Sequence, residues 1–160
     1  MPAGQATIVG KANMKNIGSI IFLLYKFFSI ILLPIFYLLI IYRKSQKKEC
    51  QINYLQRFAI NKNSVNFAKQ GKVIWLHAVS VGESNSAWNL IDEILTILPD
   101  YNILFTTTTV TSAQLIVQKI DNNPAYQTRI IHQYFPLDSY FVVKKFLRNT
   151  SPSLCIFIES

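Results

Sequence analysis

Residues 73 to 98, VIWLHAVSVGESNSAWNLIDEILTIL, contain an apolar strand-like run, a polar loop and a helix-like segment in direct succession. The apolar run is 73–77, and Gly82 and Glu83 interrupt the apolar character a few residues later. From residue 84 to residue 98 apolar side chains recur at helical spacing, and Pro99 ends the pattern. A strand followed by a short loop and a helix is the unit from which parallel sheets are built.

The same unit recurs to the end of the chain. Further strands are predicted at 102–108, 129–135 and 154–159, and further helices at 111–120 and 138–149. The alternation predicts an α/β fold in which a parallel sheet is covered by helices on both faces. Ligands of such sheets bind beyond the carboxyl ends of the strands, so the loops that follow the strands are the place to look for chemistry.

The N-terminal part of the chain is of a different kind. Residues 17–42 carry a single charge, Lys26, and are long enough to cross a bilayer as a helix. Either the whole segment of about 26 residues is the span, or residues 27–42 form its core with Lys26 at the interface. Residues 1–16 are polar and predicted to be a disordered tail.

Positive charge is concentrated after the apolar segment. The formal net charge is +8, of which residues 43–72 carry +7, whereas residues 73–160 carry −2. We expect 43–72 to form a basic helix and loop next to an anionic leaflet, and the positive-inside rule places this side in the cytoplasm. No DNA- or RNA-binding motif accompanies the charge, so nucleic acid is not an expected partner. The two cysteines have no metal-binding or redox spacing, and no cofactor or metal is expected.

Five residues at the predicted strand ends are candidates for chemistry. Gly82 allows a left-handed turn or a close backbone approach, and Glu83 is placed just before a helix N-terminus, where the ionised carboxylate is favoured. Position alone leaves Glu83 open between a helix cap and a general base. Ser80 and Ser84 offer hydroxyl groups, and Glu159 ends the last strand.

Four motifs, in this order, resemble a known family. They are LHAVSVGE (76–83), TTTTVTS (106–112), YFPLD (134–138) and IFIES (156–160), preceded by an apolar anchor and a basic stretch. Together they resemble the N-terminal part of the 3-deoxy-D-manno-octulosonic acid (Kdo) transferases, and the resemblance covers roughly residues 20–160.

The resemblance implies a two-domain GT-B glycosyltransferase of lipopolysaccharide inner-core synthesis, of which residues 73–160 would be the incomplete, Rossmann-like N-terminal domain. It implies a lipid A precursor as acceptor, CMP-Kdo as donor, inverting transfer without a metal, and a place at the cytoplasmic side of the inner membrane, single-pass or monotopic. Glu83 would be the general base and Glu159 a stabiliser of the transition state. Ser80, Gly82 and Ser84 would contact the substrate.

The sequence also departs from the family pattern. Gln56 and Ala59 stand where Glu and Gly are usual, and Ser112 stands where Gly is usual. The chain stops at Ser160, before the donor-binding domain, so we expect a truncated or split half that is inactive alone; if it is split, a separate chain carrying that domain is its partner. The alternative is a non-catalytic remnant or a membrane-bound interaction module.

Overall fold

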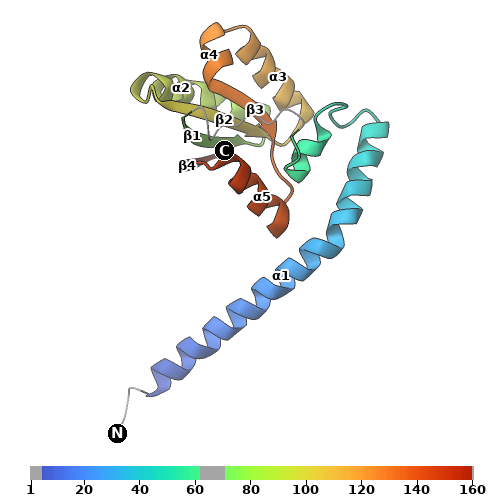
Figure 1. Cartoon of the computed structure of the whole chain (residues 1–160), viewed down its shortest axis with the longest axis vertical. Helices are drawn as coiled ribbons and strands as arrows, with labels where there is room; N and C mark the ends of the chain where they lie inside the picture. Colours follow the sequence, from blue (N-terminus) through green and yellow to red (C-terminus); the bar gives the residue numbers. More distant parts are fainter. Residues whose placement is uncertain (1–4, 62–70, 160) are drawn as a thin grey trace.

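The structure is a computed structural model that describes residues 5–61 and 71–159. Residues 62–70, which belong to the expected basic segment, lie outside the described residues. The chain begins with one long helix and continues into an α/β domain whose sheet lies beside it (Figure 1).

Four parallel strands form the sheet, in the order β3-β2-β1-β4. They are β1 (Lys72–Ala78), β2 (Tyr101–Thr107), β3 (Ile130–Tyr134) and β4 (Leu154–Ile158). In the register, Ala78 pairs with both Thr107 and Ile158, and Thr107 pairs with Tyr134. The last residues of all four strands therefore lie along one edge of the sheet. The predicted α/β fold class with a Rossmann-like parallel sheet is confirmed.

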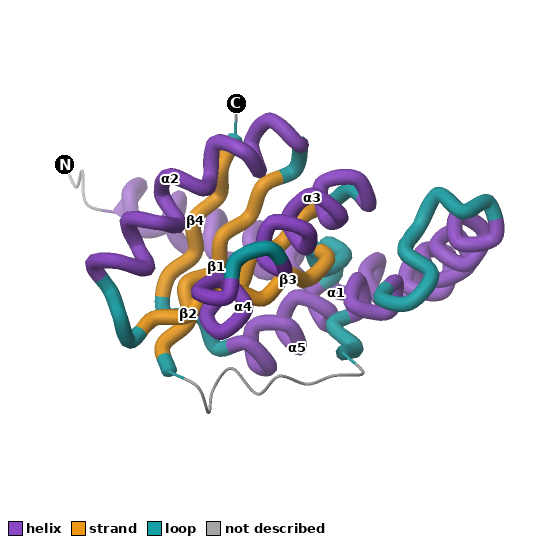
Figure 2. The backbone as a smooth tube through the Cα atoms, turned by 90° about the horizontal axis from the view of Figure 1, so that it is seen from above, coloured by secondary structure: helices purple, strands orange, loops and turns teal. Residues whose placement is uncertain are grey.

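Helices cover the two faces of this sheet (Figure 2). On one face α2 (Val81–Ile97) and α3 (Val110–Asp121) pack over a core that includes Leu76 and Phe105. On the other face α5 (Tyr140–Thr150) packs over a smaller core around Trp75. Alternate residues of β1 belong to the two cores, as the period of two in a strand requires.

Between the predicted helix 111–120 and the predicted strand 129–135 the structure has a short helix that was not predicted, α4 (Pro124–Arg129). Asn123 accepts a hydrogen bond from the backbone N–H of Ala125 at 3.0 Å, and Pro124 occupies the first turn, where its missing N–H costs nothing. Arg129 then donates to the carbonyl groups of residues 95, 98 and 101, at 2.7, 2.7 and 2.6 Å. The guanidinium thus supplies hydrogen bonds to carbonyl groups at the carboxyl end of α2 and at the start of β2.

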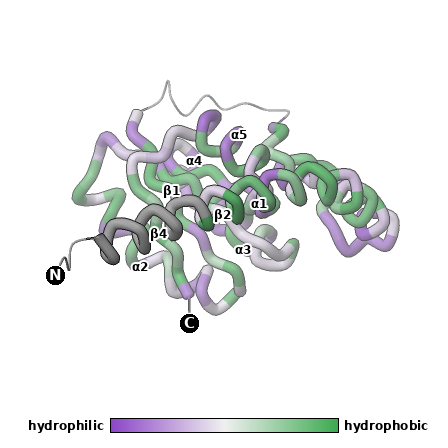
Figure 3. Tube along the Cα trace, turned by 90° about the horizontal axis from the view of Figure 1, so that it is seen from below, coloured by the Kyte–Doolittle hydropathy of each residue, from purple (hydrophilic) through white to green (hydrophobic). Residues whose placement is uncertain are grey.

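The N-terminal helix is α1 (Gln5–Ser45), which is longer than predicted. The expected tail of residues 1–16 is helical from Gln5 onward. Residues Ile17–Ser45 are long and apolar enough to cross a membrane, by length and composition, and much of their length is coloured as hydrophobic in Figure 3. After α1, a 3-10 helix, η1 (Tyr54–Phe58), replaces the helix expected in the basic segment 43–72.

Candidate functional site

The loops that carry the candidate residues follow neighbouring strands. Because Ala78 pairs with Ile158 in the parallel sheet, Val79 and Glu159 are the next residues on adjacent strands. The AVSVGES loop therefore begins beside Glu159 at the carboxyl edge of the sheet. The sequence-based expectation that the two carboxylates share one edge agrees with this register.

Glu83 forms a capping box with Ser80 at the start of α2. The Ser80 hydroxyl accepts from the backbone N–H of Glu83 at 3.2 Å, while Glu83 Oε2 accepts from the N–H groups of Ser80 at 3.1 Å and Val79 at 2.8 Å. The helix begins at Val81, so Glu83 lies in its first turn. The prediction that Glu83 precedes the helix is wrong by this margin. Two backbone donors and the positive end of the helix dipole stabilise the carboxylate charge.

A capping role and a chemical role for Glu83 are compatible in this geometry. The side chain is half-buried, and Ser80 and Gly82 beside it are exposed, so a ligand at the sheet edge can reach this turn. The hydrogen bonds from Val79 and Ser80 are made by Oε2, which fixes the orientation of the carboxylate. The contacts establish the cap, and the role as a base remains a prediction.

His77 is the buried residue directly before the AVSVGES loop. Its ring is buried, with Nδ1 at 3.0 Å from both the carbonyl and the hydroxyl oxygen of Thr106, and it stacks on Phe135 with ring centroids 3.9 Å apart. Burial lowers the pKa of His77, while the Thr106 carbonyl and the charges of Glu83 and Glu159 act in the opposite direction. Burial is the largest of these causes, so the net effect is a lowered pKa of His77.

The remaining candidate residues differ in their access to a ligand. Gly82 has no positive φ, and a Cβ atom there would meet only Ser80 Oγ, at 3.9 Å, so nothing in the described chain requires a glycine. Glu159 is exposed. Ser84, in contrast, is 1% exposed and donates to the carbonyl of Ser80 at 2.7 Å. Its hydroxyl is turned to the backbone, and contact with a substrate would require the first turn to open.

In the part of the chain that the structure describes, no three His, Cys, Asp or Glu side chains lie close enough together to bind a metal ion. His132 Nε2 lies 2.8 Å from the Thr107 hydroxyl, and burial lowers the pKa of His132 to about 4. Both described histidines are thus neutral side chains hydrogen-bonded within the sheet.

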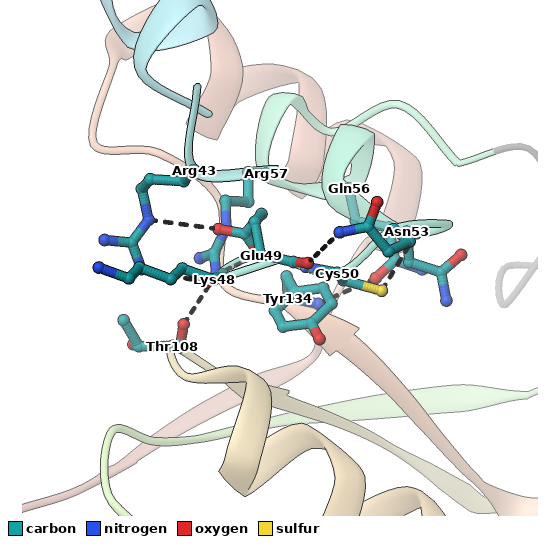
Figure 4. A network of polar contacts seen from close by, with 10 residues as sticks. Arg43, Lys48, Glu49, Cys50, Asn53, Gln56, Arg57, Thr108 and Tyr134 are labelled. Atoms are coloured by element: carbon teal, nitrogen blue, oxygen red, sulfur yellow. Dashed lines mark hydrogen bonds and ion pairs between the residues drawn. The ribbon is translucent and has the colours of Figure 1, made fainter. Parts of the chain in front are cut away.

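A buried ion pair that the sequence did not indicate lies at the same edge (Figure 4). Arg57 in η1 donates to both carboxylate oxygens of Glu49, from Nε to Oε2 and from Nη2 to Oε1, each at 3.0 Å. The Glu49 side chain is 2% exposed and the Arg57 side chain 11%. Such a bidentate pair satisfies both charges away from water.

The same arginine fastens residues 49–58 to the ends of β2 and β3. Arg57 Nη2 also donates to the carbonyl of Thr108 at 2.9 Å, and the guanidinium lies 4.8 Å from the ring centroid of Tyr134. Next to it, the side-chain oxygen of Gln56 accepts from the backbone N–H of Tyr134 at 3.0 Å. Residues 49–58 are therefore held against the carboxyl ends of β2 and β3 by specific contacts.

Comparison with known proteins shows the family of this chain. The model of the 3-deoxy-D-manno-octulosonic-acid transferase (kdotransferase) family matches residues 53–160. The chain belongs to the Kdo transferase family. A Kdo transferase of Rickettsia bellii is 40% identical over 137 residues, which are 86% of this chain and 31% of that protein.

Other Kdo transferases give the same picture. The enzyme of Rickettsia prowazekii is 32% identical over 86% of this chain and 37% of its own length, and that of Haemophilus influenzae is 32% identical over 54% and 19%. The chain thus spans about a third of the length of the Rickettsia relatives. No solved structure matches it.

The three departures from the Kdo transferase pattern each have a place in the fold. Ala59 has φ 52°, in the left-handed region that favours glycine, and it is buried. The side-chain oxygen of Gln56 accepts from the backbone N–H of Tyr134 in β3. Ser112 is fully buried in the first turn of α3, where the Thr109 hydroxyl accepts from its backbone N–H at 3.1 Å and donates to its Oγ at 2.7 Å. Gln56 and Ser112 thus form specific hydrogen bonds in this chain.

Proposed function

We propose that this chain is the acceptor-side part of a Kdo transferase that moves Kdo from CMP-Kdo to a lipid A precursor at the cytoplasmic face of the inner membrane. One observation carries the proposal: the AVSVGES loop and Glu159 lie at one carboxyl edge of the sheet in a chain of this family. The apolar helix α1 and the basic residues after it support a membrane location, because a lipid acceptor must be reached at a bilayer.

In the proposed reaction Glu83 is the general base. An acceptor hydroxyl gives its proton to the Glu83 carboxylate while its oxygen attacks the anomeric carbon of Kdo, and the bond from that carbon to the CMP phosphate breaks, so that CMP leaves with the electron pair. Attack from the face opposite the leaving group inverts the configuration. The hydrogen bonds from Val79 and Ser80 would orient the carboxylate before the proton arrives.

The other residues of the edge have supporting roles in this proposal. Ser80 would offer its hydroxyl, and Gly82 would let the acceptor sugar approach the backbone, which agrees with the open space above its Cα. Glu159 would stabilise charge that develops in the transition state. The buried hydroxyl of Ser84 supports the loop from below.

Binding of the donor would require a second part of the protein. Kdo transferases of Rickettsia are about three times the length of the matched region, and we propose that the CMP-Kdo site belongs to the part outside it, in the same or a separate polypeptide. The 160 residues alone are then expected to bind the acceptor without transferring Kdo.

The test is an assay of CMP-Kdo-dependent transfer to a lipid A precursor in membranes. The 160-residue chain is measured alone and together with the remaining part of the Rickettsia bellii enzyme. Activity only in the combination supports the proposal, and turnover by the chain alone refutes the need for a second part. If the combination is inactive although the intact Rickettsia bellii enzyme works in the same membranes, the alternative of a membrane-bound interaction module is favoured.

A further inference from the structure

One face of α1 is covered along most of the apolar segment. Within 17–45, the buried and half-buried residues recur every three or four positions and so form a single stripe along the helix. They are Lys26, Ser29, Leu33, Phe36, Ile40 and Lys44. At 1.5 Å per residue this stripe is about 27 Å long. The hydrocarbon core of a bilayer is about 30 Å thick, so the covered length is close to a whole span.

The α/β domain covers the first part of this stripe. The hydroxyl of Tyr25 donates to Asp138 at 3.0 Å, and the backbone N–H of Tyr140, at the start of α5, donates to Ser29 Oγ at 3.5 Å. The ammonium group of Lys26 lies 4.5 Å from the centroid of the Tyr140 ring. Several of these contacts are polar and specific, and they lie in the first half of the apolar segment.

Further along the helix the contacts are apolar. Tyr37 meets Phe58 of η1, with ring centroids 5.7 Å apart, and Leu33 packs against the core that contains Val142 of α5. A groove of about 380 Å³ follows this seam and is lined by apolar side chains that include Pro34 and Leu55. Figure 1 shows α5 next to α1 and the N-terminal part of α1 extending away from the domain.

The other faces of α1 are exposed and apolar. Ile20, Leu23, Phe27, Leu38 and Tyr42 are 58% to 68% exposed, and they belong to an apolar surface that runs the length of the segment. A continuous apolar surface marks a protein or membrane interaction site, and the length and hydropathy of Ile17–Ser45 favour lipid. Exposed basic residues, Arg43, Lys47 and Lys48, lie at its carboxyl end, where anionic headgroups would meet them.

A helix that crossed the bilayer with these contacts intact would carry the domain into the hydrocarbon. The start of α5 touches Ser29 in the apolar segment, and α5 carries Lys144, Lys145 and Arg148, whose charges are costly inside a membrane. A helix that lies along the membrane surface keeps both the contacts and the charges in favourable surroundings.

We propose that α1 lies in the plane of one leaflet, with the covered stripe against the domain and the remaining faces in the lipid, and does not cross the bilayer. The partner of this surface is an anionic lipid leaflet. The inference rests on the proposed membrane association and is independent of the transferase activity.

The decisive measurement is the location of the N-terminus. The full chain, expressed in a Gram-negative bacterium with an N-terminal epitope tag, is treated with protease in intact and in lysed spheroplasts, and a C-terminal tag serves as the matched control. Protection of both tags until lysis, with the chain in the membrane fraction, is the expected result. Cleavage of the N-terminal tag alone in intact spheroplasts shows a span and overturns the inference, as does a chain that stays in the soluble fraction.

Cross-linking tests whether the contacts persist in membranes. In a chain with Cys50→Ser and Cys155→Ser, the pair Ser29→Cys and Tyr140→Cys should react with a short bismaleimide. The control pair is Leu38→Cys and Tyr140→Cys, because Leu38 is 67% exposed and about 13 Å further along the helix than Ser29. Cross-linking of the first pair alone is expected. Equal cross-linking of both pairs, or none in the first, shows that the domain does not rest on α1.

Discussion

Removal of the Glu49 carboxylate should destabilise the α/β domain strongly. In Glu49→Ala the buried guanidinium of Arg57 would lose two hydrogen bonds of 3.0 Å and its counter-charge, and would keep only the Thr108 carbonyl and the Tyr134 ring. Leaving one partner of a buried ion pair uncompensated costs about 3–5 kcal/mol. That loss is a large fraction of the 5–15 kcal/mol by which domains are ordinarily stable.

A double-mutant cycle measures this pair in urea. The detergent-solubilised chain is unfolded while the fluorescence of Trp75 and Trp88, both buried in the domain, reports the transition. With a slope of about 1–3 kcal/mol per molar urea, Glu49→Ala should lower the midpoint by at least about 1 M. Glu49→Gln, which keeps the shape and an acceptor oxygen, is the milder variant if Glu49→Ala does not fold.

The cycle also has an outcome that refutes the reasoning. Arg57→Met together with Glu49→Ala should cost less than the sum of the two single changes, because no buried charge is left unpaired. If each single change costs less than about 1 kcal/mol and the two effects add, the pair behaves like an exposed one. The network would then not fasten η1 to the sheet.

Three further predictions follow from single contacts. Gly82→Ala should raise the free energy of unfolding by up to about 1 kcal/mol, since a methyl group fits and alanine favours the helix. It should also lower Kdo transfer if the acceptor approaches the backbone here. Unchanged transfer would remove Gly82 from the site. Thr109→Ala should lower stability by about 1 kcal/mol through loss of the α3 cap to Ser112, seen as a lower urea midpoint; an unchanged midpoint would contradict the cap. The pKa of His132 is about 4 when folded and near 6.5 when unfolded, so the unfolded chain binds the proton first. The contribution of His132 to the free energy of unfolding should therefore be fully present above pH 6.5. Between pH 6.5 and pH 4 the free energy of unfolding should fall by up to about 1.4 kcal/mol per pH unit. His132→Gln should flatten this profile, with His77 contributing the remaining slope; an unaltered profile would refute the assignment.

The sheet and its order of elements followed from local sequence patterns. The alternation of apolar strands with helical spacing after residue 73 is a short-range signal, and the structure has a strand at each expected place. The early start of α2 also has a local signal, the Ser80 to Glu83 spacing of a capping box. The start of α4 also has a local signal, with Asn123 as the cap and Pro124 at the first helical position.

The parts that sequence patterns missed depend on contacts between distant segments. Glu49 and Arg57 lie in irregular structure, where no periodicity shows which charges will be buried together. The seam between α1 and α5 joins residues more than a hundred positions apart, and the uniformly apolar composition of α1 concealed which face would be covered. For Glu83 the residue type and position allowed both a cap and a base, and the hydrogen bonds now establish the cap.

The most direct test of the proposed function separates these two roles of Glu83. Glu83→Gln retains an oxygen that can accept from Val79 and Ser80, so the capping box should persist and the free energy of unfolding should stay within about 0.5 kcal/mol of the native value. Its amide cannot take a proton, and CMP-Kdo-dependent transfer by the chain combined with the remaining part of the Rickettsia bellii enzyme should fall by about a hundredfold or more. Native stability with lost transfer is the result that the account predicts. Native stability with full transfer would show that Glu83 is a helix cap only.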